Sequence, residues 1–150
     1  MRRFARLRAC APWPLKYFGS IAASAFLSTW AIGGAFAETV TPVFQRALPL
    51  MEGKAFSVVT VDFAPASQSV PHRHGQAFVY AYVLQGAIRS QLEGQPAQNY
   101  VSGQSWHEDP GSHHVLTENS SASEPARLLV VFVADTGAAL KIDDSSSGAK

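Results

Sequence analysis

The chain has 150 residues, 47% of them hydrophobic and 15% charged, and its formal net charge is +1. Basic residues are concentrated at the start, so residues 38–150 hold seven basic and eleven acidic residues, a net charge of −4. A segment with this balance and no basic stripe has no general attraction for nucleic acid or for an anionic membrane surface.

The first 37 residues are typical of a secretory signal peptide. A basic start leads into an uncharged run of 21 residues that ends in Ala35-Phe36-Ala37, an A-x-A cleavage pattern. We therefore expect cleavage after Ala37 and a periplasmic or secreted protein with no membrane attachment. The alternative is an uncleaved anchor, because a run of this length can span a bilayer. The single cysteine, Cys10, precedes the cleavage point, so the remaining 113 residues have no disulfide and suffice for one domain.

Seven runs after residue 54 have the composition of short β-strands. They are rich in β-branched and aromatic residues and are separated by Gly, Pro and polar turns. The expected strands cover residues 55–63, 79–84, 87–92, 97–101, 104–108, 113–118 and 127–134. Strands of this length and spacing predict an all-β sandwich or barrel, since no segment after the signal peptide has helical periodicity. Residues 143–150 are expected to form a disordered tail.

Two histidine segments carry the main functional signal. His72 and His74, spaced i and i+2, project from the same face of an extended strand. His114 follows forty residues later, within Pro110-Gly111-Ser112-His113-His114. Three imidazoles from two distant segments form a ligand set that zinc, iron, copper and nickel accept. Neighbouring His113 is the alternative inward residue, because adjacent strand residues face opposite ways.

These segments resemble the two short motifs of the cupin superfamily. The first motif runs G-x5-H-x-H-x3or4-E-x6-G, and residues 66–86 follow it, with Ala66 in place of the first glycine. The second runs G-x5-P-x-G-x2-H-x3-N, and residues 103–119 follow it, with Asp109 in place of the proline and the asparagine one residue late. The resemblance covers residues 56–135. It implies a small antiparallel β-barrel (a double-stranded β-helix, jelly-roll-like) over residues 38–142, holding one divalent transition metal.

Val79 stands where many cupins have a glutamate ligand. The resemblance therefore implies that His72, His74 and His114 alone hold the metal. Without a carboxylate the site keeps the full +2 charge, which favours an anionic ligand or a metal-bound hydroxide. Iron, zinc, nickel and copper then suit the site better than manganese, which prefers oxygen ligands.

Two other residues are candidates for the missing role. His74 and Val79 differ in parity, so both face inward only if a bulge intervenes, and Gly75 suits one. If the strand were instead unbroken, Gln76 would share the face of His74 and serve as a weak oxygen ligand. Glu108 is a candidate general base or a substitute for the lost glutamate, with a solvated carboxylate at the barrel rim as the alternative.

The bulged register also turns a row of apolar residues outward: Phe78, Tyr80, Tyr82 and Leu84. Such a row is expected to be covered by the N-terminal strand or by a second subunit, which makes a homodimer a reasonable hypothesis.

The fold does not fix the reaction. The leading hypothesis is an exported metal-binding protein that acts on a small molecule, as a metal-dependent dioxygenase or lyase. The second is a non-catalytic periplasmic module that binds a ligand or a metal. A metal-free barrel that uses its histidines for hydrogen bonding is the third.

Overall fold

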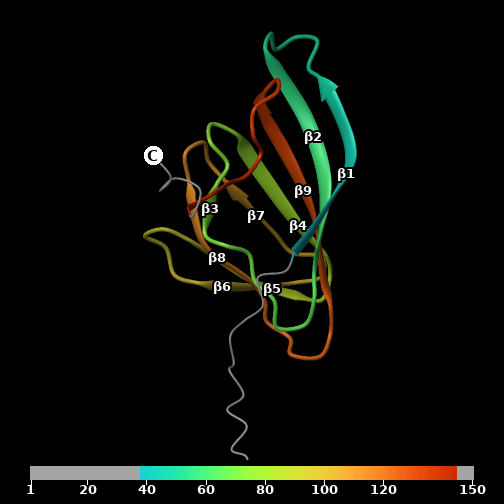
Figure 1. Ribbon diagram of the computed structural model, residues 1–150, viewed down its shortest axis with the longest axis vertical. Coiled ribbons are helices and arrows are strands. Elements are labelled where there is room, and N and C mark those ends of the chain that lie inside the picture. Colours follow the sequence, from blue (N-terminus) through green and yellow to red (C-terminus); the bar gives the residue numbers. More distant parts are fainter. Residues whose placement is uncertain (1–37, 145–150) are drawn as a thin grey trace, which may run out of the picture. The chain divides into compact units, whose positions relative to one another are not determined.

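The computed structural model describes residues 38–144, so the expected signal peptide and the last six residues lie outside the described part (Figure 1). Ten strands are present: β1 Glu38–Ala47, β2 Lys54–Phe63, β3 His72–Arg73, β4 Phe78–Gln85, β5 Ala87–Leu92, β6 Gln98–Val101, β7 Ser105–Glu108, β8 His113–Asn119, β9 Ala126–Asp135 and β10 Ile142–Asp143. Each of the seven expected strands is confirmed to within one residue at both ends. The described residues include no helix long and apolar enough to cross a membrane.

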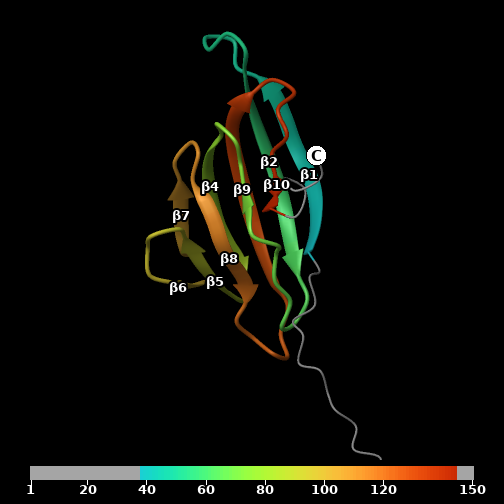
Figure 2. The same cartoon turned by 60° about the vertical axis from the view of Figure 1, so that its left-hand side comes forward.

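The strands form two five-stranded antiparallel sheets (Figure 2). The first sheet has the order β1-β2-β9-β4-β7, and the second has the order β10-β3-β8-β5-β6. The all-β fold of the double-stranded β-helix type is therefore confirmed. No ladder joins the two sheets within residues 38–144, so the expected barrel is not closed and the domain is an open β-sandwich.

The core lies on the inner face of the first sheet. β2 and β9 pair along ten residues, and every second side chain on both strands is buried. This alternation is what a strand with one face on the core requires, because successive side chains point to opposite faces. Phe63 on β2 and Val83 on β4 are at most 2% exposed, and Ile88 of the second sheet is fully buried against them.

A turn at Gly75 sets the register of β4. Gly75 has φ +59, a conformation that glycine adopts without steric cost, and the chain turns at Gly75 and Gln76 before β4 begins. Val79 consequently faces inward and is 1% exposed. The structure thus adopts the register with an interruption at Gly75, and Gln76 is exposed in the turn.

Within residues 38–144 nothing fully covers the outward row on β4, although Tyr82 is partly buried. Phe78, Tyr80 and Leu84 are 40%, 39% and 44% exposed. β1 pairs with β2, and β9 separates β2 from β4, so the N-terminal strand does not cover the row. The homodimer stays a prediction.

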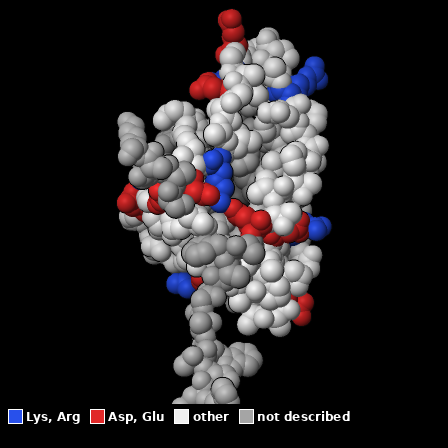
Figure 3. Space-filling view, viewed as in Figure 1, with Lys and Arg blue, Asp and Glu red and all other residues white. Residues whose placement is uncertain are grey.

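Charged side chains on the face shown in Figure 3 are interspersed, and Lys and Arg do not gather there. Several basic side chains of the domain are paired with acids, as in Lys54–Asp135, Arg89–Glu118 and Arg127–Asp62.

Candidate metal centre

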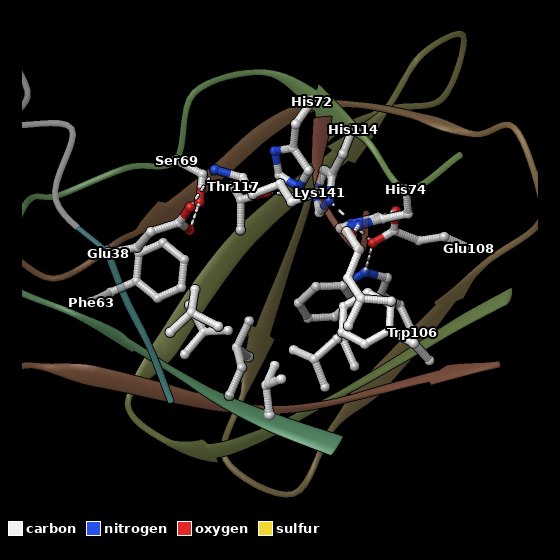
Figure 4. A pocket seen from close by; sticks show the side chains of 18 residues that line it. Glu38, Phe63, Ser69, His72, His74, Trp106, Glu108, His114, Thr117 and Lys141 are labelled. Carbon is white, nitrogen blue, oxygen red and sulfur yellow. Dashed lines mark hydrogen bonds and ion pairs between the residues drawn. The ribbon is translucent and has the colours of Figure 1, made fainter. Parts of the chain in front are cut away.

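β3 and β8 bring the two histidine segments together. In their antiparallel register His72 lies directly opposite His114, and His74 follows β3 by one residue. The ligand nitrogens of the three histidines lie within 4.8 Å of one another (Figure 4). They are therefore positioned to hold a metal ion. His113 pairs with Arg73 and contacts Glu93 and Asp144 instead, so it is not the inward residue.

Backbone carbonyl groups orient the first two imidazole rings. His72 Nδ1 lies 2.7 Å from the carbonyl oxygen of Val70, and His74 Nδ1 makes a short hydrogen bond to the carbonyl oxygen of Leu140. A carbonyl oxygen can only accept, so each Nδ1 carries the hydrogen and each Nε2 keeps a lone pair when the ring is neutral. Such a bond from the distal ring nitrogen is typical of metal-ligating histidines.

Burial keeps these two rings neutral. It lowers the pKa of His72 from 6.5 to about 4, and it also lowers the pKa of His74. Neutral imidazole is the form that binds metal, because protonation removes the lone pair. Both Nε2 atoms can therefore bind a metal ion through their lone pairs at neutral pH.

His114 is held on both sides of its ring. Its Nε2 lies 2.8 Å from Ser90 Oγ and 2.8 Å from Thr117 Oγ1, while its Nδ1 lies 3.1 Å from Glu108 Oε1. The ring is also 3% exposed, so its orientation is fixed by packing as well as by hydrogen bonds.

Glu108 is buried beside the histidines and is not a solvated rim carboxylate. It is 2% exposed, and Trp106 Nε1 donates to its Oε1 at 3.1 Å. Its Oε2 lies 3.7 Å from His74 Nε2 and has no hydrogen-bond partner. Burial opposes its ionisation, but the hydrogen bond and charge interaction with His114, the charge interaction with His74 and the hydrogen bond from Trp106 together lower the pKa of Glu108 to about 2.

The histidines and Glu108 line a cavity of about 110 Å³ between the sheets (Figure 4). Its apolar wall comes from the inner faces of β2 and β9: Val59, Val61, Phe63, Leu128, Val130 and Phe132. Gln76 does not line this cavity, so the structure does not bring it to the histidines.

A charged pair without any signal in the sequence also lines the cavity. Lys141 Nζ donates to Glu38 across a separation of 103 residues, and Glu38 accepts a short hydrogen bond from Ser69. Figure 4 shows Glu38 and Ser69 on the side of the cavity away from Glu108. Glu38 and Lys141 both lie outside the two histidine motifs, and only folding brings them together.

The donor atoms present fit a first-row transition metal. Three buried imidazoles supply nitrogen, the donor that zinc, iron, nickel and copper accept. The unpartnered Oε2 of Glu108 is a buried acceptor that a cation would satisfy.

A double-stranded β-helix with three inward histidines on adjacent segments is thus the class of protein that the fold and site define. Residues 59–132, which include all three histidines, match the family described as Cupin domain. This match covers 74 of the 150 residues, and a cupin domain is among the solved structures of similar fold. No curated protein matches the chain significantly.

Several solved structures share the fold. DMSP lyase DddQ from Ruegeria pomeroyi DSS-3 is similar with a TM-score of 0.60 and 19% identity, over 93% of this chain and 64% of its own. For the Cnp3 cupin domain of Schizosaccharomyces pombe, the TM-score is 0.55 and the identity 15%, over 66% of this chain and 62% of its own. For recombinant oxalate oxidase in complex with glycolate, the TM-score is 0.52 and the identity 21%, over 67% of this chain and 56% of its own. This chain therefore spans less than two thirds of each, and identities this low show the fold alone.

Proposed function

We propose that this protein is a metal-dependent enzyme, a lyase or a dioxygenase, that acts on a small molecule bound between the sheets. The observation that carries the proposal is the placement of the three histidines, whose ligand nitrogens lie within 4.8 Å of one another in a cavity that also has an apolar wall. A ligand in that cavity would contact the apolar side chains and the bound ion at once.

The ion that these residues would hold supplies Lewis acidity, and iron or copper would add redox chemistry. The chain's own residues bind and orient. The inner faces of β2 and β9 exclude water and contact the apolar part of the ligand, while His72 and His74 keep their lone pairs directed at the site.

The cavity limits the size of the ligand. Its volume of about 110 Å³ is smaller than the roughly 150 Å³ of an engineered cavity that binds benzene. The DMSP lyase and the oxalate oxidase of similar fold support a small substrate, although their likeness concerns the fold alone.

Elemental analysis tests the metal site first. We expect about one iron, zinc, nickel or copper ion per chain in protein purified without added metal, and none in the His72→Ala/His114→Ala variant. The metal found then decides the screen: oxygen consumption for iron or copper, and bond cleavage without oxygen for zinc or nickel. Stoichiometric metal with no turnover across a metabolite screen would favour the non-catalytic binding module.

We also propose that the protein is exported and cleaved after Ala37. The basic start, the uncharged run and the A-x-A pattern support this. Mass spectrometry of the protein from a bacterial periplasm should show an N-terminus at Glu38, whereas an intact N-terminus in the membrane fraction would indicate the uncleaved anchor.

A further inference from the structure

We propose that Glu108 is a fourth protein ligand of the metal ion, and that it takes from β7 the place that the cupin pattern gives to a glutamate on β4, at Val79. The inference rests on the proposed metal site. It changes the site from an all-nitrogen set to three nitrogens and one carboxylate oxygen.

The pairing of β4 with β7 makes the exchange geometrically direct. Val79 and Glu108 are opposite one another in the antiparallel register, and both side chains are buried on the inner face. Residues paired in this way have Cβ atoms about 5 Å apart. A carboxylate at position 108 therefore projects from the strand next to position 79 and can reach the same space. Glu108 lines the cavity, and Val79 does not.

The contact between Glu108 and His74 is not a hydrogen bond. Because His74 Nδ1 donates to the carbonyl oxygen of Leu140, the Nε2 of the neutral ring is an acceptor. It lies 3.7 Å from Glu108 Oε2, which is also an acceptor. Two acceptors that face one another in a buried site repel unless a cation lies between them.

A single ion would satisfy both atoms. Ligand bonds of about 2.1 Å to zinc allow two donors of one ion to be at most roughly 4.2 Å apart. The 3.7 Å between His74 Nε2 and Glu108 Oε2 lies within this limit. Trp106 donates to Oε1 and so fixes the carboxylate with Oε2 left for the ion.

The charge of the buried carboxylate also favours a cation beside Glu108. Within residues 38–144 the ion-pair partners of Glu108 are His74 and His114, and no Lys or Arg is paired with it. A divalent ion would balance this carboxylate and leave the site with a charge of +1. The oxygen donor also removes the expected bias against manganese, because carboxylates suit manganese and iron.

The test measures the zinc affinity of the full chain and of three variants by competition with a chromophoric chelator. Glu108→Gln keeps the shape of the side chain and removes its charge. Val79→Glu/Glu108→Gln returns a carboxylate to β4. Glu93→Gln is the matched control, since this glutamate is exposed and pairs with Arg73 and His113 on the outside.

We expect Glu108→Gln to weaken zinc binding by more than about 100-fold, beyond the roughly 10- to 100-fold typical of losing a hydrogen bond to a ligand. The double variant should recover at least tenfold of that loss, and Glu93→Gln should bind as the wild type does. A crystal structure with zinc should place a Glu108 oxygen about 2.0–2.2 Å from the ion.

Other outcomes separate the two proposals. If Glu108→Gln binds zinc within threefold of the wild type, or if the Glu108 oxygens lie beyond 3 Å from the ion, Glu108 is not a ligand and the three-histidine site stands. No recovery in the double variant would overturn the exchange with position 79. If the wild type binds no metal at all, the proposed function fails with it. The melting temperatures of the metal-free forms identify a variant that has merely lost its fold.

Discussion

His74 donates its Nδ1 hydrogen to the carbonyl oxygen of Leu140, a residue 66 positions later in the chain. Leu140 is followed by Lys141, which binds Glu38, and by β10, which pairs with β3. Residues 140–143 are thus attached to the walls of the cavity at three points. They orient one candidate ligand and line the cavity beside it.

Removing this segment should weaken metal binding. A chain that ends at Gly137 loses the acceptor for His74 Nδ1 as well as Lys141, and we expect its zinc affinity to fall roughly 10- to 100-fold, the usual cost of losing a partner that orients a ligand. A chain that ends at Asp144 is the control, because it keeps every one of these contacts. Equal affinity in the two truncated chains, measured by calorimetry, would show that the Leu140 carbonyl does not matter.

Acid should destabilise the metal-free protein. Burial lowers the pKa of His72 from 6.5 to about 4, so between these values the unfolded chain binds a proton that the folded protein does not. The free energy of unfolding therefore falls as the pH drops through this window and levels off below about pH 4, with a contribution of up to about 3 kcal/mol. Urea unfolding in the presence of a chelator, from pH 7.5 to pH 4, measures it.

Two variants assign this pH dependence. His72→Asn should flatten the curve and leave the smaller contribution of His74, whose pKa is also lowered by burial. His74→Asn should remove that contribution in turn, because it replaces the buried ionisable ring with a group that does not titrate. The burial argument would be wrong if the wild type kept the same stability from pH 7.5 to pH 4.

The strands were predictable because their signals are local. Alternation and turn residues determined seven strands and the Gly75 register, and the two motifs located the three histidines. Position 86 requires glycine, because its φ is +74 and a Cβ there would lie 2.7 Å from the Pro125 carbonyl oxygen. Asn119, one residue late in its motif, still closes the next loop by donating to the Glu124 carbonyl oxygen at 2.7 Å.

The remaining features depend on contacts that no local pattern records. β3 and β10 have two residues each and exist only because each pairs with a neighbour. Glu108 was a candidate, but its burial follows from the pairing of β7 with β4, which strand spacing does not specify. The pair of Glu38 and Lys141 joins the two ends of the domain, and neither residue has a neighbour in the sequence that suggests it.

The exposed row on β4 should mediate a homodimer. Phe78, Tyr80 and Leu84 form an exposed apolar surface on the outside of the first sheet. Contact with a second subunit would remove this surface from water. The full chain has a mass of 16.1 kDa, and cleavage of the signal peptide would reduce it. Sedimentation equilibrium should give twice the mass of the chain that is studied. Tyr80→Lys should shift the protein to monomer, whereas Val101→Lys on β6, also an exposed apolar position, should not. A monomeric mass at every concentration would remove the dimer.

Ala66→Gly should stabilise the protein. Ala66 has φ +56 and occupies the position where the cupin motif has glycine, and it is the non-glycine residue with positive φ in the described part of the chain. The left-handed conformation costs an L-residue about 1–2 kcal/mol, and the extra freedom of glycine in the unfolded chain offsets part of the gain. We therefore expect the free energy of unfolding to rise by up to about 1 kcal/mol. Ala87→Gly, inside β5, is the control and should lower it by roughly 0.5–1 kcal/mol, because glycine weakens a regular strand. The same sign for both substitutions in urea unfolding would show that the backbone at Ala66 is not strained.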